Sequence, residues 1–177
     1  SQKIIMPQSF NLKSIFDTKN SHKQVVILDI DSTLVSTYQR NQSILESFCQ
    51  DVAQDYPEET SLLAQAQCQW GDYGYYSALN RLDPPPSDPV FLAELQNYWR
   101  QHFFSNTFLD RDLPTPGAVE FVQALESANI AFHYLTGRYK ERMWEGTLQS
   151  LQNLGFPITE DILILKPDSK QQDSLYK

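Results

Sequence analysis

The stretch QVVILDI, residues 24–30, restricts the fold more than any other part of the sequence. Its near-continuous run of apolar, mostly β-branched residues is typical of a strand buried on both faces, as in a parallel sheet covered by helices. Two further apolar runs, 130–135 and 162–165, have the same character. The sequence therefore predicts at least three strands of one buried sheet.

Helical patterns alternate with these strands. Apolar residues recur at helical spacing over 117–128 and 140–154, and Gly155 stands where the end of a helix favours positive φ. Strands that alternate with helices indicate βαβ crossovers. We therefore expect an α/β protein with a parallel sheet.

The connection between the first two predicted strands is far longer than an ordinary βαβ crossover. Apolar residues follow helical spacing over 44–52 and 91–103, and a proline-rich turn at 82–86 separates these segments. Residues 41–112 are therefore predicted to form a small helical subdomain inserted after the first strand. This segment has eleven acidic residues against three arginines and accounts for the whole net charge of −8. Such a surface repels a nucleic-acid backbone, so no nucleic-acid partner is expected.

The composition is that of a packed globular protein, with 41% apolar and 12% aromatic residues in 177. No apolar run approaches the roughly 20 residues that a membrane helix needs, so no membrane partner is expected. The N-terminal residues SQKIIMPQSF lack the apolar core of a secretory signal. We expect a cytoplasmic protein, and the sequence does not specify its oligomeric state.

Two carboxylates follow the first predicted strand, Asp29 and Asp31. Ligands of open α/β sheets bind at the carboxyl ends of the strands, where one carboxylate could attack phosphorus while the other gives a proton to the leaving oxygen. The pair could also bind Mg²⁺, which takes one or two carboxylates together with phosphate oxygens. The alternative is that both residues cap a turn. It is disfavoured because Asp29 follows apolar residues, where an unpaired charge is costly to bury.

The segment VVILDIDSTL resembles the first motif, DxDx[TV], of phosphatases in the haloacid dehalogenase (HAD) superfamily. The run AFHYLT at 131–136 resembles the second motif, and PTPGAVEFVQAL resembles the helix that precedes it. The resemblance implies a Rossmann-like (HAD) three-layer core formed by residues 1–40 and 113–177. It also implies that residues 41–112 form an α-helical cap.

The resemblance assigns roles to these residues. Asp29 would be the nucleophile that forms an aspartyl-phosphate, and Asp31 the general acid and base. Thr136 and the backbone of Gly137 would bind the phosphate of a small phosphorylated substrate, and Mg²⁺ would be held at Asp29 and Asp31. A lysine of the third motif would steady the phosphate charge, and both Lys166 and Lys177 are candidates. Lys177 is preferred, because the C-terminal segment looks like the acid-phosphatase branch of the superfamily.

The chain departs from the family pattern at the fourth motif, whose acidic residues complete the Mg²⁺ site after a later strand. No strand follows Lys177, and Asp168 and Asp173 lie too early. We therefore expect the α/β core to be truncated, without its last strands.

The predicted cap is rich in aromatic residues that could contact the leaving group of a substrate. Core packing is the favoured role for Trp99 and Phe103, because both follow helical spacing. The less periodic segment 70–76 is the better candidate for a contact surface. The other aromatic candidates are Trp70, Tyr73, Tyr75, Tyr76 and Phe104.

The predicted function is Mg²⁺-dependent hydrolysis of phosphate monoesters. A phosphomutase or phosphotransferase of the same fold stays open, because it would use the same aspartyl-phosphate with another acceptor. A catalytically silent binding protein also stays open, given the missing fourth motif. Cleavage of a carbon–halogen bond is disfavoured, since it needs no acid at Asp31.

Overall fold

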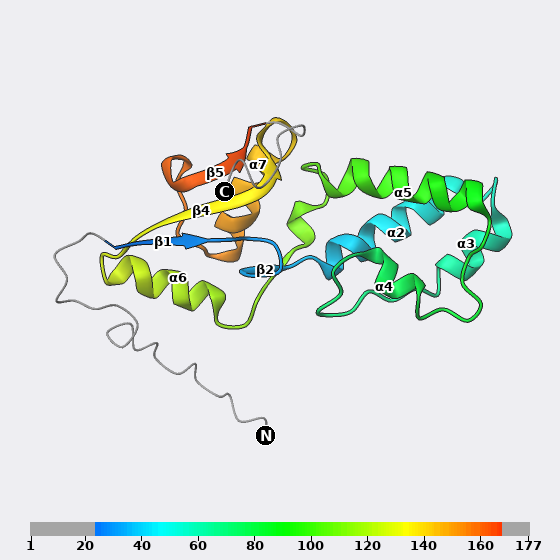
Figure 1. The fold of residues 1–177 in the computed structure, drawn as a ribbon, viewed down its shortest axis with the longest axis horizontal. Helices are drawn as coiled ribbons and strands as arrows, with labels where there is room; N and C mark the ends of the chain where they lie inside the picture. Colours follow the sequence, from blue (N-terminus) through cyan, green and yellow to red (C-terminus); the bar gives the residue numbers. More distant parts are fainter. Residues whose placement is uncertain (1–23, 168–177) are drawn as a thin grey trace, which may run out of the picture.

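The computed structural model describes residues 24–167. This part of the chain has two regions, an α/β region and a helical region (Figure 1). The α/β region contains strands β1, β4 and β5 with helices α6 and α7, and the helical region contains α2 to α5. Lys177 and the C-terminal acids Asp168 and Asp173 lie outside the described residues.

A parallel sheet in the order β1-β4-β5 forms the centre of the α/β region (Figure 1). β1 spans Val25–Leu28, β4 spans Ala131–Tyr139 and β5 spans Leu163–Lys166. β4 runs beyond the predicted 130–135 and carries Thr136, Gly137 and Arg138 within the strand. The predictions of an α/β class and of a parallel sheet are confirmed.

The prediction that the first strand is buried on both faces is wrong for the described part of the chain. Val26 and Leu28 contribute to the core, whereas Val25 is 50% exposed and Ile27 is 56% exposed. The exposed side chains alternate with those in the core, so they point to the face of β1 that the described helices leave open. β1 also lies at the edge of the described sheet, where it pairs with β4 on one side. Apolar composition alone does not tell an edge strand from a central one.

Helices α6 (Ala118–Ser127) and α7 (Lys140–Leu154) pack against the sheet and were both predicted from periodicity. Val122 and Leu125 of α6 and Met143 and Leu151 of α7 join one core with the strands. α7 ends at Gly155, whose φ of 92° places it in the left-handed region. The short 3₁₀ helix Glu160–Ile162 then leads into β5.

The helical region has a core of its own. Its helices are α2 (Tyr38–Val52), α3 (Pro57–Leu63), α4 (Tyr75–Leu79) and α5 (Pro89–Phe103). Helices α2 and α5 pack together, and Phe48 and Phe91 meet between them with ring centroids 5.3 Å apart. Helices in segment 41–112 are thus present, while a cap role for them remains a prediction.

A short antiparallel pair connects the two regions. The chain leaves the α/β region through β2 (Val35–Ser36) and returns through a 3₁₀ turn at Leu109–Arg111 and β3 (Leu113–Pro114). Val35 pairs with Pro114, and Ser36 pairs with Leu113. Both ends of the helical segment are therefore held side by side, next to the end of β1.

No helix among residues 24–167 combines the length and apolar character that crossing a membrane requires.

Replacing Gly155 tests the left-handed end of α7. We expect Gly155→Ala to lower the free energy of unfolding by about 1 kcal/mol, because a Cβ disfavours this φ. An added Cβ would make only ordinary contacts, the nearest 3.5 Å from Val119, so the effect is one of backbone conformation. Urea unfolding measures it.

Gly74→Ala is the matched control. Gly74 has an extended backbone with φ of −178°, and an added Cβ would lie in open space. Its unfolding midpoint should stay close to that of the wild type. Equal losses for the two variants would contradict the assignment of the Gly155 effect to positive φ.

Candidate functional site

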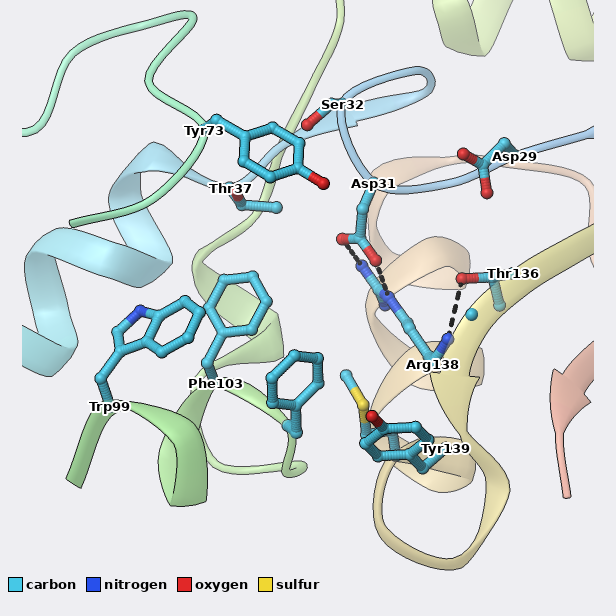
Figure 2. Close-up of a pocket in the computed structure, with 13 residues that line it drawn as sticks. Asp29, Asp31, Ser32, Thr37, Tyr73, Trp99, Phe103, Thr136, Arg138 and Tyr139 are labelled. Atoms are coloured by element: carbon cyan, nitrogen blue, oxygen red, sulfur yellow. Dashed lines mark hydrogen bonds and ion pairs between the residues drawn. The ribbon is translucent and has the colours of Figure 1, made fainter. Parts of the chain in front are cut away.

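The carboxyl ends of β1 and β4 place the predicted site residues around one cavity. Parallel pairing of Leu28 with Tyr134 brings the residues that follow β1 next to the second half of β4. The cavity has a volume of about 310 Å³, and Asp29, Asp31, Thr136 and Gly137 all line it. The structure therefore brings together four predicted site residues from two segments that are far apart in the sequence; Figure 2 shows three of them, Asp29, Asp31 and Thr136.

A tight turn after β1 positions the carboxylate of Asp31. The carbonyl of Ile30 accepts hydrogen bonds from the backbone amides of Leu34 and Val35 at 2.9 and 3.1 Å. Ser32 has a φ of 61°, which reverses the chain within a few residues. Asp31 is carried by this turn, and its side chain is 31% exposed.

Asp31 makes ion pairs with two buried arginines. Arg138 binds it in bidentate fashion, with Nε donating to Oδ2 at 2.9 Å and Nη2 donating to Oδ1 at 2.8 Å (Figure 2). Arg40 donates from Nη2 to Oδ1 at 2.7 Å. Fork-shaped contacts of this kind are the strongest ion pairs that arginine forms. Asp31 is therefore held in a defined orientation.

Asp112 completes a cluster of two carboxylates and two guanidinium groups, called here the carboxylate–arginine quartet (Asp31, Arg40, Asp112 and Arg138). Arg40 donates to both oxygens of Asp112 at 2.8 and 2.7 Å, and Arg138 donates to Oδ2 at 2.8 Å. The side chains of Arg40, Asp112 and Arg138 are at most 1% exposed. The charges of the quartet sum to zero, which offsets the cost of burying them.

The quartet changes the protonation of Asp31. Burial by itself raises the pKa of this carboxyl, but the charges and hydrogen bonds of Arg138 and Arg40 outweigh it and hold the pKa well below its usual range. Asp31 is thus an anion in the described arrangement, and it accepts hydrogen bonds rather than donating them. Its predicted role as general acid stays a prediction, and requires the arginine contacts to change.

Thr136 is buried in β4 and faces the cavity. Its Oγ1 accepts a hydrogen bond from the backbone amide of Arg138 at 3.2 Å (Figure 2). This contact uses a lone pair, so the hydroxyl proton can be donated in another direction. The geometry is compatible with the predicted contact between Thr136 and a phosphate oxygen.

Of the two candidate lysines, the structure describes Lys166. It is buried at the end of β5, opposite Tyr139 of β4, and its Nζ lies 5.1 Å from the centroid of the Tyr139 ring. Tyr139 itself lines the cavity. Lys166 thus lies beside a residue of the cavity wall and does not line the cavity itself. The choice between Lys166 and Lys177 stays a prediction.

Sequence reasoning missed three members of the quartet: Arg40, Asp112 and Arg138. Arg138 could have been identified as a site residue from the sequence, because it directly follows the Thr-Gly of the second motif. Arg40 and Asp112 flank the helical segment and are 72 positions apart in the chain. Nothing in their local sequence distinguishes them from the exposed charges nearby.

The described residues do not form a complete site for the predicted Mg²⁺. Both oxygens of Asp31 accept hydrogen bonds from arginine, which competes with coordination of a cation. Within 24–167 there is no group of three or more His, Cys, Asp or Glu side chains placed to hold a metal. Asp29 could still supply one carboxylate ligand, so Mg²⁺ stays a prediction and no step is assigned to it.

Comparisons with known proteins give distant similarities to solved structures. No family model and no curated protein matches the chain. The chain is similar to a class C acid phosphatase from Bacillus anthracis with tungstate bound, at 15% identity and a TM-score of 0.43, over 87% of this chain and 45% of that one. It is also similar to a HAD family hydrolase from Deinococcus radiodurans R1 with bound phosphate and sodium, at 18% identity and a TM-score of 0.39, over 80% and 57% of the two chains.

A third similar structure is a hydrolase from Pseudomonas syringae, at 16% identity and a TM-score of 0.39, over 80% of this chain and 60% of that one. The chain thus spans about half the length of the solved structures that it matches. Because the TM-scores are low, the function proposed below rests on the site itself.

Replacing Asp112 tests the quartet. We expect Asp112→Asn to lower the free energy of unfolding by about 3–5 kcal/mol, because it leaves a buried excess of positive charge. Urea unfolding followed by circular dichroism measures the change. Asp110→Asn is the control, since Asp110 is exposed and 3.8 Å from Arg111; its unfolding midpoint should not change. Equal stability of the two variants would contradict a structural role for the quartet.

Proposed function

We propose that this chain hydrolyses phosphate monoesters through an aspartyl-phosphate formed on Asp29. The observation that supports this most is the meeting of Asp29, Asp31, Thr136 and Gly137 around one cavity at the carboxyl ends of two parallel strands. A carboxylate nucleophile, a hydroxyl donor and a nearby guanidinium group are each suited to phosphoryl transfer, which depends on positioning and on stabilisation of the phosphoryl charge.

In the first proposed step an oxygen of Asp29 attacks phosphorus, and the bond between phosphorus and the ester oxygen breaks. The Thr136 hydroxyl and the backbone at Gly137 donate to the phosphoryl oxygens. The leaving oxygen takes a proton and departs as an alcohol. In the second step water attacks the aspartyl-phosphate, inorganic phosphate leaves, and the Asp29 carboxylate is restored.

Asp31 is the proposed proton donor for the leaving oxygen and the base for the attacking water. The arginine contacts hold it as an anion before substrate binds. A phosphate dianion in the cavity competes with Asp31 for the guanidinium of Arg138, which also lines the cavity. Weaker pairing with arginine raises the proton affinity of Asp31, so that it can take up from solvent the proton that it then gives to the leaving oxygen.

The helical segment 41–112 is proposed to act as a cap over the core formed by 1–40 and 113–177. Support comes from Tyr73, Trp99 and Phe103, which belong to this segment and line the same cavity as Asp29. A cover of this kind excludes water from a reacting phosphoryl group. The substrate is accordingly proposed to be a small phosphorylated molecule.

Replacing the nucleophile tests the proposed reaction. We expect Asp29→Asn, in the full-length protein, to lower the rate of phosphate release from p-nitrophenyl phosphate by at least about 1000-fold, because an amide is a far weaker nucleophile. Asp55→Asn, which alters an exposed aspartate after α2, should keep the wild-type rate. Phosphate release that survives Asp29→Asn would refute the covalent mechanism.

The same assay tests the proposed requirement for Mg²⁺. Activity of the wild type should disappear on chelation with EDTA and return when Mg²⁺ is added in excess. Activity that EDTA leaves unchanged would contradict the Mg²⁺ requirement only. The covalent mechanism would still be tested separately, by comparing the wild type with Asp29→Asn.

A further inference from the structure

The cavity beside Asp29 has two ends of different chemistry. Its charged lining residues, Asp29, Asp31 and Arg138, lie at one end together with Thr136 (Figure 2). The rest of the wall is mainly aromatic and apolar, and is formed by Tyr73, Trp99, Phe103, Phe104, Tyr139 and Met143. A molecule that fills this cavity therefore meets polar groups at one end and ring faces at the other.

One side of the aromatic end is fixed in place. The indole Nε1 of Trp99 donates to Oδ1 of Asn41 at 2.7 Å, and its ring stacks on Phe103 with centroids 4.7 Å apart and planes at 27°. The Arg40 guanidinium lies 4.3 Å from the Phe103 centroid and also donates to the Phe103 carbonyl at 3.2 Å. The quartet and this aromatic wall thus share Arg40.

The opposite side is the ring of Tyr73, which lies across the cavity from Phe103 (Figure 2). The loop that carries it is anchored by Asp72, which accepts hydrogen bonds from Arg81 at 2.9 and 2.6 Å and from the amide of Gln69 at 2.7 Å. The Tyr73 side chain is nevertheless 89% exposed. An anchored loop thus holds a solvent-exposed ring at the mouth of the cavity, opposite a rigid pair of rings.

We propose that this aromatic end binds the leaving group, and that it selects a planar, uncharged aromatic ring carried by the phosphate ester. The proposal rests on the proposed function. A flat ring can lie against Tyr73 on one side and against Phe103 and Trp99 on the other, and aromatic contacts of this kind favour planar partners over saturated ones. Among residues 24–167 the charged lining residues lie at the phosphate end, so a charge on the leaving group would find no counter-charge from this part of the chain in the wall.

Two esters with alcohols of similar reactivity test the proposal, 2-phenylethyl phosphate and 2-cyclohexylethyl phosphate. The leaving groups differ in the planarity of the ring and hardly in size. We expect the wild type to prefer the phenyl ester by about 3- to 10-fold in kcat/KM, the size of one aromatic contact. Tyr73→Leu should abolish this preference, whereas Tyr73→Phe should retain it because the ring face is kept.

Tyr76→Leu is the matched control. Tyr76 is also an exposed aromatic residue of the same segment, but it lines a different hollow, beside Tyr75 and Leu92. This variant should keep the preference for the phenyl ester. Equal kcat/KM values for the two esters in the wild type, or a preference that Tyr73→Leu leaves unchanged, would overturn the proposal.

Binding of the matching phosphonates, which cannot be hydrolysed, separates this proposal from the proposed function. Calorimetry with 2-phenylethylphosphonate and 2-cyclohexylethylphosphonate should show the same preference, and the same loss in Tyr73→Leu. A preference in binding without any hydrolysis would leave the aromatic subsite standing and refute the phosphatase function. Hydrolysis of both esters with no preference in binding would support the phosphatase function and refute the aromatic subsite.

Discussion

The carboxylate–arginine quartet is the interaction on which the described structure most depends. Arg40 and Arg138 each reach both Asp31 and Asp112 at 2.7–2.8 Å, so neither guanidinium can be moved without disturbing two carboxylates. The four residues come from the turn after β1, from α2, from the segment before β3 and from β4. A neutral, largely buried and hydrogen-bonded cluster of this kind fixes how the segments meet, because any misfit leaves a charge unpaired in the interior.

The quartet also couples the polar end of the cavity to its aromatic end. Arg40 pairs with Asp31 on one side and lies over the ring of Phe103 on the other. Phe103 in turn stacks on Trp99, and Asn41, next to Arg40 in the chain, holds the Trp99 indole. One arginine near the start of α2 thus positions both the proposed proton donor and the proposed leaving-group wall.

For Trp99 and Phe103, sequence periodicity predicted the helix correctly but did not show that both side chains also line the cavity. Their spacing predicted a helix packed in a core, and both lie on α5 as expected. Their rings also line the cavity beside Asp29. Of the aromatic residues in segment 70–76, Tyr73 alone lines this cavity, because the turn around Asp72 directs it there while Tyr75 is buried in the helical core.

The sequence by itself determined the α/β class, the helices and strands of the described core, and the meeting of Asp29, Asp31, Thr136 and Gly137 at one edge of the sheet. The class and the elements follow from local periodicity. The place of Thr136 and Gly137 beside Asp29 and Asp31 was implied by the resemblance of two segments to HAD motifs, at strand ends where ligands of α/β sheets bind. Only the tertiary structure decided that β1 lies at the edge of the described sheet and that Asp31 is bound by Arg138 and Arg40 with Asp112 behind them. The physical reason is that strand order and buried ion pairs join residues that are far apart in the chain. The sequence around one charged side chain does not show which distant charge will pair with it.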